Sequence, residues 1–176
     1  MSEKLKYRIR NGRQEDVHTI FTLVRELAKY EKLLHEVVAT EDDYYRFGSG
    51  PTPYFQTLIA EVLEEGRWKP VGFALYFFTF STFLGKPTLY LEDLFVLPEY
   101  RGNGIGRTVL GYLAQIALEH DCGRMEWAVL NWNTPAIEFY KKIGAKPLDE
   151  WTTYRLQVPE MKNLSEWVTA NAQEEE

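Results

Sequence analysis

The 176-residue sequence has little cysteine and no long uninterrupted apolar run. Its single cysteine, Cys122, excludes a disulfide within the chain, and we expect a reducing, cytoplasmic environment. The N-terminus lacks the apolar core of a signal peptide. The longest apolar stretch, residues 71–80, contains Gly72 and Thr79 and is too short to span a bilayer. We therefore expect no membrane partner.

Basic residues are outnumbered by acidic ones, with 20 lysines and arginines against 26 aspartates and glutamates and a net charge of −6. Nucleic-acid binders show a basic excess or cluster, so we expect no nucleic-acid partner. A negative surface instead attracts cations. His18, His35 and His120 do not cluster in the sequence, and we expect no metal site. The length suits one domain over residues 1–176, with a core at about 7–158 and a tail at 159–176.

Hydrophobic periodicity predicts alternating strands and helices. The expected strands are residues 7–10, 54–62, 71–80, 88–96, 124–130 and 151–158. Helices are expected after the first strand, after the N-cap Thr40, after residues 101–106, over residues 135–143 and in the tail. Short turns between the second, third and fourth strands predict antiparallel neighbours. We therefore predict an α+β fold with a mixed, mostly antiparallel central sheet flanked by helices.

The segment Arg101-Gly102-Asn103-Gly104-Ile105-Gly106 joins a predicted strand to a predicted helix. Helix N-termini bind anions through free backbone N–H groups, and glycines let a phosphate approach the backbone closely. A dinucleotide fingerprint is excluded because Arg107 stands where it needs glycine, and the P-loop spacing also fails. The segment predicts a pyrophosphate site with Arg101 and Arg107 close by, and the alternative is a flexible loop that caps a helix.

Together with the preceding Leu94-Phe95-Val96, this loop resembles the acetyl-CoA loop of the GCN5-related N-acetyltransferases. Asn133, Ala136, Phe139, Tyr140 and Gly144 are similar to a later motif of that superfamily. Residues 26–31, 89–93 and 139–144 resemble the spermidine/spermine N1-acetyltransferases and their relatives, the thialysine Nε-acetyltransferases.

The resemblance spans about residues 7–156 and implies the GCN5-related fold, with acetyl-CoA as the acetyl donor. It also implies a homodimer with the C-terminal strand region and aromatic residues at the interface. The cofactor-binding positions that it implies are Leu94, Phe95, Val96, Arg101, Gly102, Asn103, Gly104, Ile105, Gly106, Arg107, Asn133 and Lys142. For Asn133 a plain helix cap, and for Lys142 a surface position, are equal alternatives.

Acetyl transfer from a thioester to an amine requires a proton acceptor, because an alkylamine has a pKa near 10.4 and arrives charged. The resemblance implies Tyr140 as the general acid for the leaving thiolate and Glu92 as the acceptor of the amine proton, through water. Adjacent residues of a regular strand face opposite sides, so Glu92 and Asp93 share a site only if the strand is bulged, as the family's strand is. The alternative for Tyr140 is a tyrosine of the core. The alternative for Glu92 and Asp93 is a carboxylate that faces an edge or pairs with a basic residue.

The resemblance places seven residues around the amine: Tyr30, Glu31, Glu92, Asp93, Glu126, Trp127 and Ala128. Acidic and aromatic side chains suit an aliphatic cation. The sequence departs from the polyamine enzymes at Ser81-Thr82, where they carry an acidic residue, and at Tyr154, where they tend to carry Trp. These departures favour a short lysine-like or diamine substrate acetylated directly in a ternary complex, with polyamines left open. Protein acetylation and a non-catalytic acyl-CoA-binding module are the rival functions.

Overall fold

The computed structural model describes residues 5–171, and the chain divides after Ala128 into two compact units. The first unit carries the five-stranded sheet and the helices α1 to α3. The second carries α4 and α5. Each unit is described by itself below, and the single domain over residues 1–176 stays a prediction.

The sheet has the strand order β1-β2-β3-β4-β5. Its strands are β1 (Tyr7–Asn11), β2 (Gln56–Glu64), β3 (Arg67–Ser81), β4 (Lys86–Val96) and β5 (Arg124–Trp127). The first four pair antiparallel, and β5 pairs parallel to β4 after the crossover through α3. The α+β class with a mixed, mostly antiparallel sheet is therefore confirmed.

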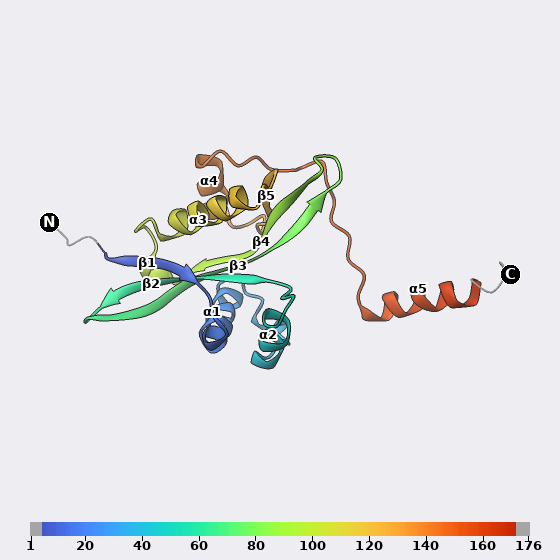
Figure 1. Cartoon of the computed structure of the whole chain (residues 1–176), viewed down its shortest axis with the longest axis horizontal. Coiled ribbons are helices and arrows are strands. Elements are labelled where there is room, and N and C mark those ends of the chain that lie inside the picture. The colour runs from blue at the N-terminus through green and yellow to red at the C-terminus, as the bar shows by residue number, and fades with distance from the viewer. Residues whose placement is uncertain (1–4, 172–176) are drawn as a thin grey trace. The chain divides into compact units, whose positions relative to one another are not determined.

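Helices cover both faces of the sheet, with α1 (Val17–Tyr30) and α2 (Glu41–Gly48) on one face and α3 (Ile105–Glu119) on the other (Figure 1). The predicted cap at Thr40 is confirmed, because its side chain accepts from the Asp43 backbone N–H and Asp43 reaches back to the Thr40 N–H. On the α1 face, Ile20, Leu23 and Leu27 pack against apolar residues of the sheet. Those sheet residues are Ile59, Phe73, Leu75 and Phe95.

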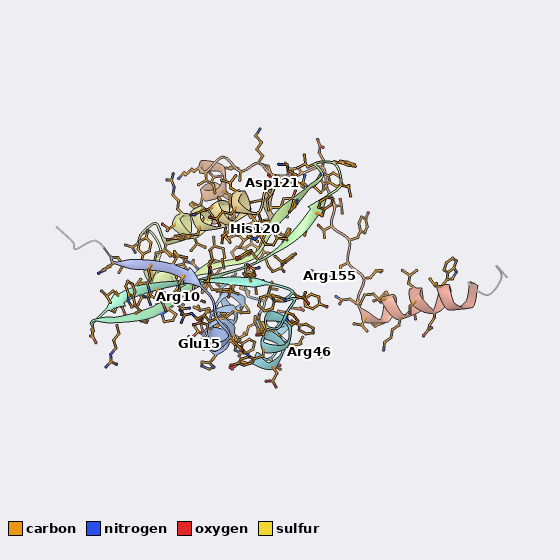
Figure 2. The ribbon with its side chains drawn as sticks, in the orientation of Figure 1. Arg10, Glu15, Arg46, His120, Asp121 and Arg155 are labelled. Atoms are coloured by element: carbon orange, nitrogen blue, oxygen red, sulfur yellow. The ribbon has the colours of Figure 1, made fainter. Side chains whose placement is uncertain are left out.

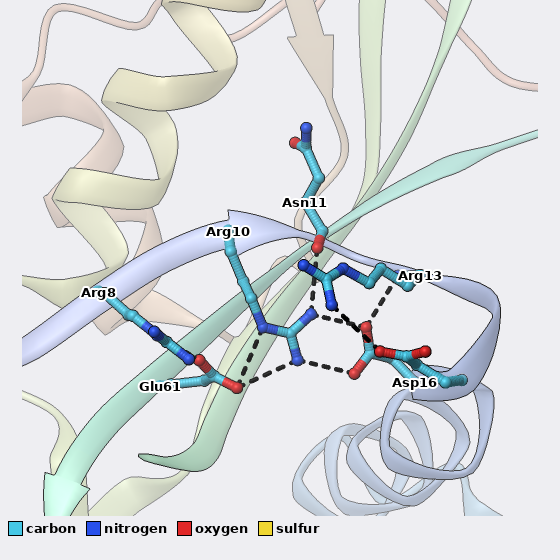
Figure 3. A network of polar contacts seen from close by, with 7 residues as sticks. Arg8, Arg10, Asn11, Arg13, Asp16 and Glu61 are labelled. Carbon is cyan, nitrogen blue, oxygen red and sulfur yellow. Dashed lines mark hydrogen bonds and ion pairs between the residues drawn. The ribbon is translucent and has the colours of Figure 1, made fainter.

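A polar network holds the start of α1 against the sheet (Figure 3). The Arg10 guanidinium donates to both carboxylate oxygens of Asp16 at 2.7 Å and to Glu61 at 3.1 Å. Arg8 donates to the second oxygen of Glu61 at 2.6 Å. Asp16 and Glu61 are buried, with 7% and 5% of their surface exposed, so these arginines compensate carboxylates that have left water.

The second unit contains α4 (Thr134–Lys142), α5 (Val158–Asn171) and a connecting stretch in which Figure 2 shows Arg155. The strand predicted over residues 151–158 is wrong: residues 151–157 belong to no helix or strand, and Val158 begins α5. The segment has the composition of a strand, but a strand forms only against a neighbouring backbone edge, and no strand of the described chain pairs with it. The predicted tail helix is confirmed as α5.

Candidate functional site

The glycine loop lies between a short 3-10 helix, η3 (Pro98–Tyr100), and the N-terminus of α3. Gly102 and Gly104 have φ angles of 81° and 83°, a backbone conformation that favours glycine. The Asn103 side-chain amide donates to the Tyr100 carbonyl at 3.0 Å and to the Arg101 carbonyl at 3.2 Å. A Cβ atom on Gly106 would meet nothing within 4 Å, so the space beside this first turn is open to an anion.

The two arginines of the loop region have different surroundings. Arg101 Nε donates to the Val96 carbonyl at 2.8 Å, and its guanidinium lies 4.3 Å from the Tyr30 ring centroid and 5.3 Å from that of Phe95. Arg107 is an exposed residue in the first turn of α3. Arg101 thus joins the glycine loop to the end of α1, where the predicted amine-binding residues begin.

The edge of β4 becomes free beside this loop. The pairing of β4 with β5 ends at Leu91 and Trp127, whereas β4 continues to Val96. Within the described chain, residues 92–96 therefore have no β5 partner. Apart from the Val96 carbonyl, which accepts from Arg101, the backbone groups on that side form a strand edge with which a ligand can pair. Leu94, Phe95 and Val96, predicted to contact the cofactor, lie in this free segment.

A β-bulge occurs in β4 at Glu92. Asp93 pairs with Leu75 and Leu91 pairs with Tyr76, which leaves Glu92 as an extra residue without a partner on β3. Residues paired across strands share a face, so Asp93 shares the α1 face with Leu75. Tyr90 pairs with Phe77 and lies on the same face, although regular alternation would place residues 90 and 93 on opposite faces.

The bulge brings carboxylates together next to the aromatic residues Tyr44 and Phe55. Burial, the charge of Glu92 and the charge of Glu31 raise the pKa of Asp93 to about 7. Burial also raises the pKa of Glu31, at the end of α1. Tyr44 of α2 packs edge-on against Phe55, and burial together with the charge of Asp93 raises its pKa to about 12. The three predicted carboxylates of this region are therefore neighbours, and their environment disfavours ionisation of Asp93.

The β5 residues predicted to surround the amine separate onto two faces. Glu126 pairs with Tyr90 and so lies on the α1 face, where its charge and that of Glu92 contribute, after burial, to a raised Tyr90 pKa. Arg124 forms an ion pair with Glu126 at 2.8 Å. Trp127 pairs with Leu91 on the opposite face, and Ala128 follows the end of β5.

The remaining predicted residues lie in the second unit. The Asn133 side chain accepts from the Ala136 backbone N–H at 3.4 Å and caps α4. Tyr140 is half-buried on α4, and burial raises the pKa of its phenol, which therefore stays protonated at neutral pH. Lys142 is exposed at the last position of α4, and Gly144 follows with a φ of 91° as the predicted C-terminal cap.

Two features of this region were not predicted from the sequence. Tyr44 and Tyr90 lie beside the carboxylates, but neither was predicted as a site residue, because their proximity depends on how α2 packs and how β4 is bulged. A cavity of about 480 Å³, between the end of β1, α2 and the C-terminus of α3, is lined by Tyr44 and by none of the predicted site residues.

None of the helices over residues 5–171 is both long and apolar enough to cross a bilayer. Across the same residues, no group of three or more histidines, cysteines or carboxylates is arranged to hold a metal ion.

Comparison with known proteins shows similarity over most of the chain. The profile of the acetyltransferase (GNAT) family matches residues 18–145. Thialysine N-epsilon-acetyltransferase of Mus musculus is 39% identical over 165 residues, which cover 90% of this chain and 96% of the mouse protein. Spermidine/spermine N(1)-acetyltransferase-like protein 1 of Homo sapiens is 37% identical over 90% of this chain and 24% of the human protein. An integron cassette protein structure from V. cholerae, 28% identical, has a TM-score of 0.73 and covers 91% of this chain and 98% of its own.

Proposed function

The chain belongs to the acetyltransferase (GNAT) family and is an N-acetyltransferase. We propose that it transfers acetyl from acetyl-CoA to the primary amine of a small lysine-like amino acid or diamine. The observation that carries the proposal is the group of Glu31, Glu92 and Asp93 at the bulge of β4. An aliphatic ammonium gains from carboxylates and from aromatic rings such as Tyr30. Thialysine, in the name of the mouse relative, is a lysine-like amine of this kind.

The residues of the chain fit acetyl-CoA in two places. The open first turn of α3 offers backbone N–H groups to a pyrophosphate, and Arg107 adds positive charge. The free edge of residues 92–96 offers backbone groups to the amides of a pantetheine arm. The family resemblance adds Asn133 and Lys142 to the cofactor contacts that we propose. Acetyl-CoA, when bound, supplies an activated acyl group as a thioester.

In the proposed reaction the amine nitrogen bonds to the thioester carbonyl carbon, and the carbon–sulfur bond breaks. Glu92 accepts the amine proton through water, since the bulge exposes its side chain. Tyr140 donates a proton to the departing sulfur. A backbone N–H near Leu94 or Val96 stabilises the oxyanion. Cys122 takes no part, because the transfer is direct.

The function is tested by turnover with purified chain and acetyl-CoA, followed by free thiol release. The acceptors are thialysine, lysine, ornithine, diaminopropane, putrescine, spermidine and a lysine peptide. We expect turnover of thialysine or the short diamines above that of spermidine. Binding of CoA without turnover of any amine would support a non-catalytic module, and turnover of the peptide alone would overturn the small-amine proposal.

The roles of the two catalytic residues are tested by substitution. Tyr140→Phe is expected to lower kcat by about 100-fold with little change in the affinity for CoA, because it removes the general acid. Glu92→Gln is expected to lower kcat/KM for the amine, with a defect that shrinks at high pH as free amine becomes abundant. Glu65→Gln, at an exposed turn between β2 and β3, is the matched control. A defect of Glu92→Gln that does not change with pH would assign Glu92 a structural role.

We further propose a homodimer, supported by apolar side chains that the second unit leaves exposed. The exposed fraction is 75% for Trp151 and 91% for Tyr154, and α5 exposes about half of Leu164 and Val168. Exposed apolar side chains support the proposal, because large apolar patches on a surface are typical of protein–protein interfaces. Light scattering should give twice the chain mass, and Tyr154→Asp should shift the population toward monomer. A wild-type monomer at micromolar concentration would contradict the dimer.

A further inference from the structure

The glycine loop is fastened to the sheet at both of its ends by tyrosine hydroxyl groups. On the side of η3, the Tyr100 hydroxyl donates to Glu64 at 2.7 Å and accepts from the Lys69 ammonium at 2.8 Å. Glu64 is the last residue of β2 and Lys69 lies near the start of β3, so the anchor is the β2–β3 hairpin. The Tyr100 side chain is 8% exposed, and its carbonyl accepts from the Asn103 side chain within the loop.

On the side of α3, the Tyr7 hydroxyl from β1 lies 2.8 Å from the Thr108 hydroxyl oxygen. Thr108 in turn donates to the carbonyl of Gly104 at 3.2 Å, and Gly104 is the N-cap of α3. Since the Thr108 hydrogen is used in this way, Tyr7 is the donor to Thr108. The second anchor is therefore the edge strand β1, and it holds the residue at which the loop becomes helix.

We propose that Tyr100 and Tyr7, with Thr108, are positioning residues for the phosphate groups of CoA. The inference rests on the proposed function and deepens it. Gly102 and Gly104 give the loop a wide choice of backbone conformations when it is unrestrained. The two hydroxyl groups restrict that choice before a ligand arrives, so that less conformational freedom is lost on binding. They act through the backbone of the loop, because their hydrogen bonds go to Glu64, Lys69 and Thr108.

The test uses the full chain with two pairs of variants. Tyr100→Phe removes the first anchor and keeps the buried ring, and Lys69→Met weakens the same anchor from the surface, where folding is not at risk. Thr108→Val removes the second anchor, whereas Thr108→Ser keeps the hydroxyl group. Tyr112→Phe, an exposed tyrosine on α3, is the matched control. The readouts are KM for acetyl-CoA, KM for the amine, kcat, the melting temperature, and the heat of binding of CoA itself.

We expect Tyr100→Phe and Thr108→Val to raise KM for acetyl-CoA about five- to tenfold, the effect of about one hydrogen bond, with kcat at saturation unchanged. Lys69→Met should raise the KM for acetyl-CoA less, Thr108→Ser should keep it near the wild-type value, and Tyr112→Phe should leave it unchanged. Loss of folded protein would instead lower kcat without changing KM, so equal KM values, or a loss of kcat alone, overturn the inference. Absence of CoA binding by the wild-type chain would overturn the proposed function itself.

Discussion

Two groups of carboxylates in the first unit have opposite electrostatic surroundings. Asp16 and Glu61 face the guanidinium groups of Arg10 and Arg8, and the pKa of each carboxyl is lowered. The pKa of Asp16 is lowered mainly by its hydrogen bond to Arg10. The pKa of Glu61 is lowered because the hydrogen bonds from both arginines outweigh burial, which acts to raise it. Asp93 has burial and the negative charges of Glu92 and Glu31 around it, and its pKa is raised. The first group holds the start of α1 against the sheet, and the second is the group at which we propose that the amine binds.

The two groups also give opposite dependences on pH. The lowered pKa values of Asp16 and Glu61 mean that their contribution to stability is present above about pH 4 to 5 and is lost as the pH falls through the folded values. The raised pKa of Asp93 means that the native state binds this proton more tightly than the unfolded chain. Its contribution to stability therefore decreases as the pH rises from about 4 to about 7.

Removing the arginine that pairs with Asp16 and Glu61 should have the largest effect on stability. Arg10→Met leaves the buried Asp16 and one oxygen of Glu61 without their guanidinium partner, and we expect a loss of about 3 kcal/mol in the free energy of unfolding. Urea denaturation at pH 7 measures it. Arg13→Met is the control, because its ion pair with Glu15 is exposed and contributes less than about 1 kcal/mol. Equal losses in the two variants would show that the Arg10 network has no special role.

Neutralising Asp93, the carboxyl with negative neighbours, should change stability by an intermediate amount and in the opposite direction. Asp93→Asn removes a charge that is costly to bury, so the variant should be more stable than the wild type at pH 8 while it loses amine affinity. The gain at pH 8 should exceed the gain at pH 5 by on the order of 2 kcal/mol, because the wild-type carboxyl is protonated at the lower pH. Denaturation curves at both pH values measure the difference, and a gain that does not change with pH would contradict it.

The smallest expected effect comes from removing one negative neighbour. Glu31→Gln should lower the pKa of Asp93, since the charge of Glu31 contributes to raising it, and should change stability by less than about 1 kcal/mol. Carbon-13 NMR of the Asp93 carboxyl during a pH titration measures the shift. Glu36→Gln, an exposed residue, is the control. An unchanged titration of Asp93 in Glu31→Gln would show that burial and the charge of Glu92 raise its pKa without Glu31.

Local sequence signals predicted most of the first unit. The glycine loop, the Thr40 cap and the strands around residues 56–96 depend on backbone conformation and on periodicity, which neighbouring residues largely determine. The bulge at Glu92 was expected only through the family resemblance, since the letters of residues 88–96 are compatible with a regular strand.

Contacts between distant segments account for what was missed. Arg10 and Glu61 are 51 positions apart, and Tyr44 and Asp93 are brought together by the packing of α2. The strand expected at residues 151–158 failed for a related reason, because a strand depends on a partner edge that its own sequence does not supply. The proposed roles of Tyr140 and Glu92 stay predictions.

The early end of β5 has a consequence for how this protein tolerates mutation. Main-chain N–H and C=O groups are identical in every residue type except proline, which lacks the N–H. An acyl donor recognised along residues 92–96 through those groups is therefore insensitive to most side-chain replacements there, provided that the strand persists. Replacements at residues 93–96 can then reshape the proposed amine site while recognition of the proposed donor is kept, so one scaffold can change its acceptor as long as Glu92 is retained.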